Sequence, residues 1–141
     1  MNKTIKVVVF GSFDPLHDGH RFLFNEAKKL GDDLTVIVAR DSSIRNIKGR
    51  EPEAGEERRR LAVAGESAVD RAILGNEGDR FRILDELDAD VVALGYDQEP
   101  DDATIRDRLD RLGKRDVRVA RLGTYQPHKY KSSLLRQARE D

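Results

Sequence analysis

The stretch GSFDPLHDGH, Gly11–His20, comes directly after the apolar run IKVVVF and determines how the rest of the chain can be arranged. That run is short and rich in β-branched residues, as buried strands are, and a glycine ends it. Leu23, Ala27 and Leu30 then recur at helical spacing until Gly31, so the stretch joins a strand to a helix. Its two histidines, two aspartates and proline stand in a single turn. Folding alone does not require so many titratable groups together, so the turn is a candidate ligand site.

The remainder of the chain repeats this alternation of strand and helix. Strands are predicted at Ile5–Phe10, Leu34–Ala39, Ala72–Leu74, Val91–Leu94 and Val117–Leu122. Helices are predicted between and after them, at the segment ending in Gly31 and at Glu56–Ala64, Arg80–Leu87, Ala103–Leu112 and Ser132–Arg139. The pattern predicts an α/β fold: one Rossmann-like domain over residues 1–141, with a doubly wound, five-stranded parallel sheet in the order 3-2-1-4-5 and helices on both faces.

Composition narrows the class of protein. The 141 residues include 26 basic and 27 acidic side chains, for a net charge of −1, whereas nucleic-acid-binding scaffolds usually carry a basic excess. The absence of cysteine excludes disulfides, thiolate zinc sites and cysteine nucleophiles. No apolar run reaches the length of a signal peptide or a membrane span. We therefore expect a cytoplasmic protein whose partners are neither nucleic acids nor membranes.

The predicted strand order places the ligand site. Strands one and four are neighbours in that order, so Gly11–His20 and the loop GYDQEP meet at the carboxyl edge of the sheet. His17 and His20 can lie on one face of the helix, with Asp18 as its cap, and donate to phosphate oxygens. Gly11 would let a ligand approach the backbone. Two alternatives remain: a zinc site that combines the histidines with nearby aspartates, and a purely structural capping loop.

The turn resembles the H-x-G-H signature of the nucleotidyltransferase superfamily, which includes the cytidylyltransferases, pantetheine-phosphate adenylyltransferase and class I aminoacyl-tRNA synthetases. Further motifs, VARD, IKGREP, EERRRL, AILG, LGYDQ and KSS, make the chain most similar to the archaeal type of FAD synthase. Glycerol-3-phosphate cytidylyltransferase is a close cousin of that family. The resemblance extends over nearly the whole chain.

This resemblance implies direct transfer of an adenylyl group from ATP to FMN, which yields FAD and pyrophosphate without a covalent enzyme intermediate. The alternative is a CTP-dependent cytidylyltransferase acting on glycerol 3-phosphate or a similar phosphorylated alcohol. Mg²⁺ or another divalent cation would be held mainly by the nucleotide, with no metal ligand from the protein. Relatives are often homodimers, which the edge helices could support. A nucleotide-binding regulator without turnover and a flavodoxin-like electron carrier are rival classes; the charged turn is unlike the Ser/Thr/Gly-rich turn of such carriers.

The family's pattern also implies roles for particular residues. The catalytic residues would be His17, His20 and Lys48. The nucleotide would be contacted by Ser12, Phe13, Asp18, Gly19, Asp97, Tyr125, Ser132 and Ser133, and the acceptor by Asp14, Lys48 and Arg58. Lys48 would lie on a lid within the polar stretch Asp41–Glu57, where Gly49, Pro52 and Gly55 break any helix; an ordinary solvated loop is the alternative.

Several of these roles have a structural alternative. Asp97 can also be a turn residue, the serine pair a helix cap and Tyr125 a core or surface side chain. Arg59 and Arg60 are interpreted as surface charges, and His128 has no assigned role.

Overall fold

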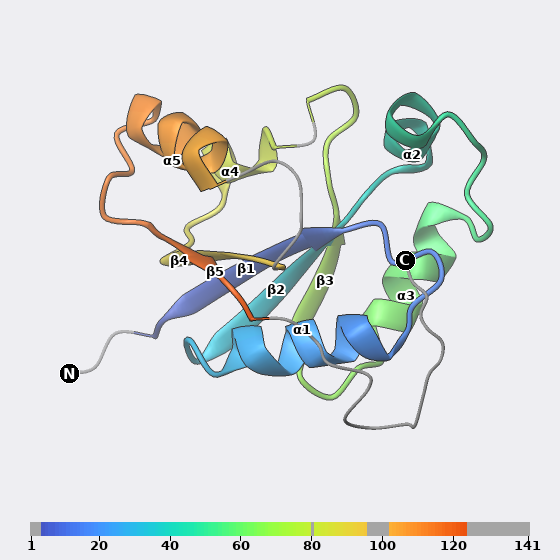
Figure 1. The fold of residues 1–141 in the computed structure, drawn as a ribbon, viewed down its shortest axis with the longest axis horizontal. Coiled ribbons are helices and arrows are strands. Elements are labelled where there is room, and N and C mark those ends of the chain that lie inside the picture. Colours follow the sequence, from blue (N-terminus) through green and yellow to red (C-terminus); the bar gives the residue numbers. More distant parts are fainter. Residues whose placement is uncertain (1–3, 80, 96–101, 124–141) are drawn as a thin grey trace.

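The computed structural model describes residues 4–79, 81–95 and 102–123. Its strands are β1 (Lys6–Gly11), β2 (Asp33–Val38), β3 (Arg71–Leu74), β4 (Val91–Leu94) and β5 (Arg118–Arg121). All strand pairs are parallel, and the order across the sheet is β3-β2-β1-β4-β5. The predicted Rossmann-like α/β fold, with its strand order 3-2-1-4-5, is therefore confirmed (Figure 1).

The helices are α1 (Asp18–Lys28), α2 (Asp41–Lys48), α3 (Glu56–Ala64), α4 (Ile83–Glu86) and α5 (Asp102–Arg111). The sequence-based expectation that no helix forms in Asp41–Glu57 is wrong for its first half, which forms α2. That helix ends where the expected breaker stands, because Gly49 takes the left-handed conformation at φ 68°. Buried Ile44 anchors it. The segment expected at Arg80–Leu87 is one short turn of helix, and Ser132–Arg139 lies outside the described residues.

The core consists of two layers, one on each face of the sheet. Successive residues of a strand point to opposite faces, so Val7 and Val9 pack on one side, with α1 and α3, while Val8 and Phe10 pack on the other, with α4 and α5. Figure 1 shows α1 and α3 below the sheet and α4 and α5 above it. Both faces of β1 are covered, which explains its continuous apolar sequence.

The central strand β1 pairs with β2 on one side and β4 on the other. The two neighbours lead to opposite halves of the sheet, so their loops diverge and leave a hollow at the carboxyl end of β1. The backbone N–H of Ala39 donates to the carbonyl of Gly11 at 2.9 Å, which extends the β1–β2 contact to this edge. The turn that follows Gly11 therefore begins at the switch point of the sheet.

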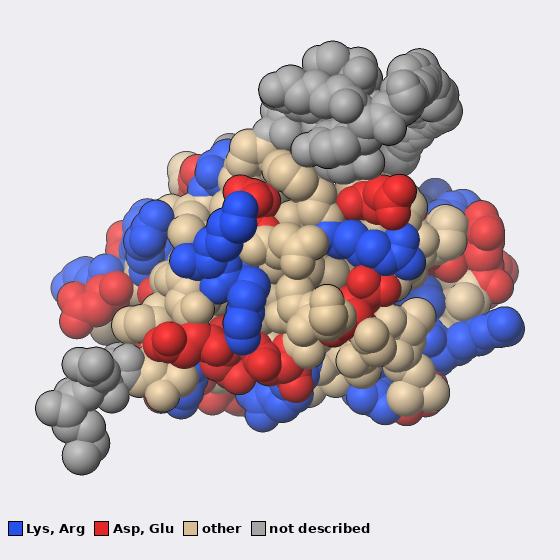
Figure 2. All heavy atoms as spheres, turned by 90° about the horizontal axis from the view of Figure 1, so that it is seen from below, with Lys and Arg blue, Asp and Glu red and all other residues tan. Residues whose placement is uncertain are grey.

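Charged side chains of both signs are interspersed over the surface. On the face seen from below in Figure 2, lysines and arginines alternate with aspartates and glutamates around patches of other residues. Ion pairs such as Arg21–Glu66 and Lys28–Asp70 contribute to this mixture. Among the described residues, no helix is both long enough and apolar enough to cross a membrane.

Candidate active site

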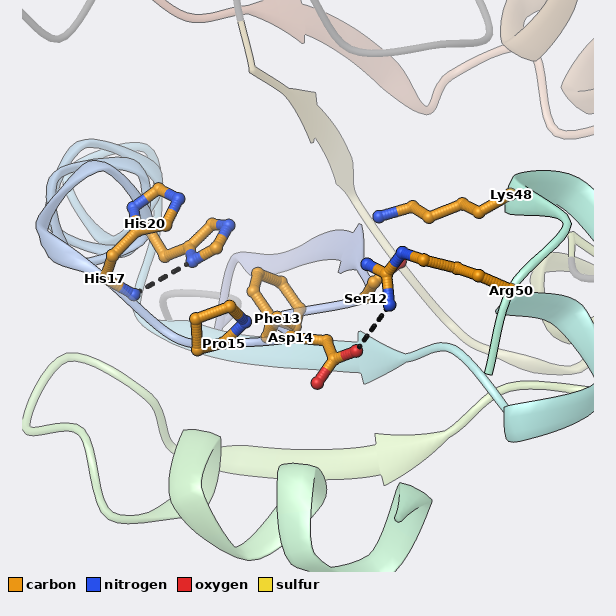
Figure 3. A pocket seen from close by; sticks show the side chains of 8 residues that line it. All are labelled: Ser12, Phe13, Asp14, Pro15, His17, His20, Lys48 and Arg50. Carbon is orange, nitrogen blue, oxygen red and sulfur yellow. Dashed lines mark hydrogen bonds and ion pairs between the residues drawn. The ribbon is translucent and has the colours of Figure 1, made fainter. Parts of the chain in front are cut away.

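A pocket of about 360 Å³ opens at the carboxyl edge of the sheet. Two segments far apart in the sequence form its walls. The turn after β1 and the start of α1 supply one wall, and the end of α2 with the residue after its glycine supplies the other (Figure 3). The lining residues are Ser12, Phe13, Asp14, Pro15, His17, His20, Lys48 and Arg50.

The two histidines cap α1 together. The N–H of Gly19 donates to Nδ1 of His17 at 3.1 Å, and the N–H of His17 donates to Nδ1 of His20 at 3.1 Å. The rings stack with their centroids 3.8 Å apart. The prediction that Asp18 caps this helix is wrong, since His17 is the N-cap residue. Asp18 instead begins the helix and pairs with Arg21 at 3.0 Å, outside the pocket.

These hydrogen bonds determine which nitrogen of each ring carries the proton. A backbone N–H needs an unprotonated nitrogen as acceptor, so the neutral ring must carry its hydrogen on Nε2. Burial lowers the pKa of His20 to about 3, and the electrostatic interactions with His17, Lys48 and Arg21 act in the same direction. Burial also lowers the pKa of His17. Both imidazoles are therefore neutral at pH 7, and each has one Nε2–H left to donate.

Phe13 supports the histidine pair from below. Its ring is 3% exposed and lies edge-on to the ring of His20, at 4.9 Å between centroids. The residue has a positive φ of 55°, which turns its side chain under the strand it follows. A Cβ on Gly11 would overlap with this ring. The space that Gly11 leaves open is thus filled by Phe13, not by the ligand expected from the sequence.

Asp14 points away from the open pocket. Its carboxylate accepts the N–H of Glu53 at 2.8 Å and the N–H of Ala54 at 3.1 Å, and it pairs with Arg50 at 3.4 Å. Burial alone would raise the pKa of Asp14, but these N–H groups, Arg50 and Arg59 lower it on balance. The side chain is 1% exposed. In this structure both carboxylate oxygens are engaged by the segment after α2, so contact with an acceptor stays a prediction.

The opposite wall is basic. Lys48 ends α2 and extends across the pocket toward the histidines, with Arg50 beside it (Figure 3). Within residues 4–79, 81–95 and 102–123, no carboxylate lies within ion-pair distance of the Lys48 ammonium group. The sequence reasoning identified Lys48 but missed Arg50. The signal was available, because the left-handed Gly49 between them reverses the chain and allows both cations to face one cavity.

The three consecutive arginines of α3 have three different environments. Arg58 is exposed and does not line the pocket, so its contact with the acceptor stays a prediction. Arg60 pairs with Glu57. Arg59 is 2% exposed, and the interpretation of this residue as a surface charge is wrong. Its guanidinium donates to three backbone carbonyl groups and pairs with one carboxylate.

The other predicted contacts cannot be placed. Asp97, Tyr125, Ser132 and Ser133, together with His128, lie outside the described residues. Within the described part of the chain, no group of three or more His, Cys, Asp or Glu side chains is arranged to hold a metal ion. The aspartates considered for a zinc site face other partners, Asp14 toward Glu53 and Asp18 toward Arg21. The pocket is instead lined by the imidazole N–H donors and by the cations Lys48 and Arg50, which suit a polyphosphate.

Comparison with known proteins agrees with this geometry. The family model for cytidylyltransferase-like proteins matches residues 8–138. A FAD synthase from Thermoplasma volcanium is 42% identical over 132 residues, which are 94% of this chain and 92% of that protein. A FAD synthase from Archaeoglobus profundus is 42% identical over 92% of this chain and 81% of that protein.

A solved structure extends the comparison to the fold. The crystal structure described as the lipopolysaccharide core biosynthesis protein from Thermoplasma volcanium GSS1 is 42% identical, with a TM-score of 0.82, and the match covers 88% of this chain and all of that one. The resemblance to FAD synthases that the motifs indicated is confirmed. On the strength of its family model, its relatives and its histidine-lined pocket, the chain belongs to the cytidylyltransferase-like family and is a nucleotidyltransferase.

Proposed function

We propose that this chain transfers the adenylyl group of ATP to the phosphate of FMN, which gives FAD and pyrophosphate. The carrying observation is that two neutral Nε2–H donors and two cations, Lys48 and Arg50, face one cavity at the switch point of the sheet. Such a set of donors stabilises negative charge without supplying a nucleophile. The names of the relatives, FAD synthases at about 40% identity, support FMN as the acceptor.

The reaction needs little covalent chemistry from the protein. An oxygen of the FMN phosphate attacks the α-phosphorus of ATP, a new P–O bond forms, and the bond from that phosphorus to the bridging α–β oxygen breaks, so that pyrophosphate leaves. His17 and His20 would donate Nε2–H to the oxygens on which charge develops. Lys48 and Arg50 would neutralise the departing pyrophosphate. The histidines need not exchange a proton, because the attacking FMN phosphate is already an anion.

Mg²⁺ fits this site as a companion of the nucleotide. The pocket is lined by N–H donors and cations, and its carboxylate, Asp14, is engaged by backbone N–H groups and by Arg50. Hence the polyphosphate itself, not the protein, would supply the oxygen ligands that Mg²⁺ prefers. The bound cation would withdraw charge from the phosphates as pyrophosphate leaves. We also propose that the reaction takes place in the cytoplasm and that the partners are small molecules and not nucleic acids. Light scattering would test whether the protein forms a homodimer.

Parallel assays test the choice of substrates. Purified protein is incubated with Mg²⁺ and either ATP plus FMN or CTP plus glycerol 3-phosphate, and pyrophosphate release is followed in both, with FAD measured by chromatography in the first. We expect FAD and pyrophosphate in equal amounts from the first pair only. Turnover of CTP alone would reject the FAD assignment in favour of the cytidylyltransferase. Tight ATP binding without turnover of either pair would indicate a nucleotide-binding regulator.

A further inference from the structure

The two walls of the pocket come from segments that no strand pairing joins. One wall is the turn after β1, and the other is the end of α2 with the segment Gly49–Gly55 that follows it. That segment has no regular secondary structure, and most of its residues are exposed. Its position therefore depends on the side chains that hold it. Two buried charged groups do so, one from the turn and one from α3.

Asp14 holds the segment by its N–H groups. The carboxylate accepts from Glu53 and Ala54 and pairs with Arg50, the pocket's second cation (Figure 3). A carboxylate that accepts several N–H bonds gains from each of them, and burial leaves water little opportunity to compete. Through these bonds, Asp14 in the first wall holds two backbone N–H groups and one side chain of the second wall.

Arg59 holds the same segment from its other side. Its Nε donates to the carbonyl of Ala54 at 2.8 Å, so this residue is gripped at both its N–H and its C=O. The other donors of the guanidinium reach Ser12 O at 3.0 Å, Ala39 O at 2.7 Å and the Asp41 carboxylate at 2.7 Å. These groups belong to the turn after β1, the residue after β2 and the first residue of α2. A planar group with five N–H donors can join such dispersed acceptors, and a lysine cannot.

We propose that Asp14 and Arg59 are positioning residues that hold Lys48 and Arg50 against the two histidines. Both ends of the lysine-bearing unit are tied: α2 at Asp41 by Arg59, and the segment after it at Ala54 by both residues. Lys48 lies between the two ties and has an exposed side chain, so they determine its distance from the histidines. The expected effect on kcat rests on the proposed function. The expected effect on the structure rests on the hydrogen bonds alone.

The structural half is tested by amide hydrogen exchange on the full chain. Asp14→Asn keeps the size of the side chain but replaces one acceptor oxygen with an NH₂ group. We expect faster exchange at the N–H groups of Glu53 and Ala54. The matched control is Asp70→Asn, because Asp70 also accepts a backbone N–H, that of Leu34, and pairs with a lysine, but at the amino end of β2. The control should expose Leu34 only. Unchanged exchange at Glu53 and Ala54 in Asp14→Asn would overturn the proposal.

The kinetic half is tested by a double-mutant cycle with Lys48→Ala. If Asp14 acts through the cations, Asp14→Asn should lower kcat about tenfold in the wild-type background but less than about twofold where Lys48 is already absent. The control Asp70→Asn should leave kcat unchanged in both backgrounds. Arg59→Lys should behave as Asp14→Asn does, provided its circular dichroism is native. Fully additive losses would show that Asp14 only stabilises the fold and would overturn the positioning role.

Failure of the proposed function has a different signature. If the wild-type chain forms no FAD from ATP and FMN, that assignment fails, while the exchange result at Glu53 and Ala54 still decides whether the ties exist. In that case, the dissociation constant of ATP is measured by calorimetry for the four proteins of the double-mutant cycle. Coupling between Asp14 and Lys48 in ATP affinity supports the positioning role, and strict additivity rejects it.

Discussion

Substituting His17 by asparagine separates two functions of one ring. Nδ1 of His17 accepts the Gly19 N–H at 3.1 Å and so caps α1, whereas Nε2–H is free to donate to a phosphate. Asparagine is a favoured N-cap residue in the extended conformation that His17 adopts, at φ −145° and ψ −179°. Its side-chain oxygen replaces Nδ1 as the acceptor, but no atom replaces Nε2–H. His17→Asn should keep the cap and lose the donor.

The expected magnitudes follow from these contacts. His17→Ala removes the cap, which costs about 1 kcal/mol of the free energy of unfolding. For a chain of 141 residues this lowers Tm by about 4 °C. His17→Asn should keep Tm within about 1 °C of wild type, because one acceptor replaces another. Both variants lose a donor to charge that develops in the transition state, so kcat should fall about 10²–10³-fold in each.

Two measurements test this reasoning together. Thermal unfolding followed by circular dichroism gives Tm, and FAD formation at saturating ATP and FMN gives kcat. ATP affinity by calorimetry should change only a few-fold, since the donor acts mainly as charge builds up. If His17→Asn retains more than about a third of the wild-type kcat, Nε2–H is not a catalytic donor. If it unfolds as early as His17→Ala, Nδ1 does not serve as the cap.

Three further predictions concern the rest of the site. Folding lowers the pKa of His20 from the ordinary 6.5 to about 3. As pH falls below 6.5, the unfolded state therefore binds a proton that the folded state does not bind. The contribution of the neutral ring to the free energy of unfolding is complete above pH 6.5 and is lost as pH falls toward 3. Tm should therefore drop between pH 7 and pH 5, and the drop should be smaller in His20→Asn. If thermal unfolding shows the same dependence of Tm on pH in both proteins, the pKa of His20 is not lowered. Lys48→Ala should lower kcat at least about tenfold, because a cation is lost from the pocket. Tm should change little, because the Lys48 side chain is exposed. A wild-type rate of pyrophosphate release in this variant would show that Lys48 does not take part in the reaction. Gly11→Ala should displace the Phe13 ring and with it His20, lowering both Tm and kcat. The matched control is Gly31→Ala, in which the new Cβ would lie 2.7 Å from the Ile5 carbonyl. This control should lower Tm but not kcat. An equal loss of kcat in the Gly11 and Gly31 variants would show that kcat falls through a general loss of stability.

Local patterns in the sequence were enough to predict the sheet and the principal site. Runs of apolar residues bounded by glycine or aspartate indicate strands covered on both faces. The alternation of strands and helices indicates a parallel sheet, for which few strand orders are possible. The order then places the turn after β1 at the switch point. The histidine pair stands in one turn, and the relation to FAD synthases, which pointed to Lys48, followed from several motifs that are each short and local in the chain. Such features are readable because their physical cause is local.

Tertiary contacts alone decided the rest. Arg58, Arg59 and Arg60 differ on a helix only by rotations of about 100°, so the docking of α3, not the sequence of three arginines, selects Arg59 for burial. Asp14 meets Glu53 and Ala54 across 39 and 40 positions of the chain, a distance at which no periodicity carries information. The proton on each imidazole is likewise determined by a backbone N–H that is brought into place only when α1 forms with His17 as its N-cap. A side chain's type is written in the sequence, but its partners depend on which surfaces the fold brings together.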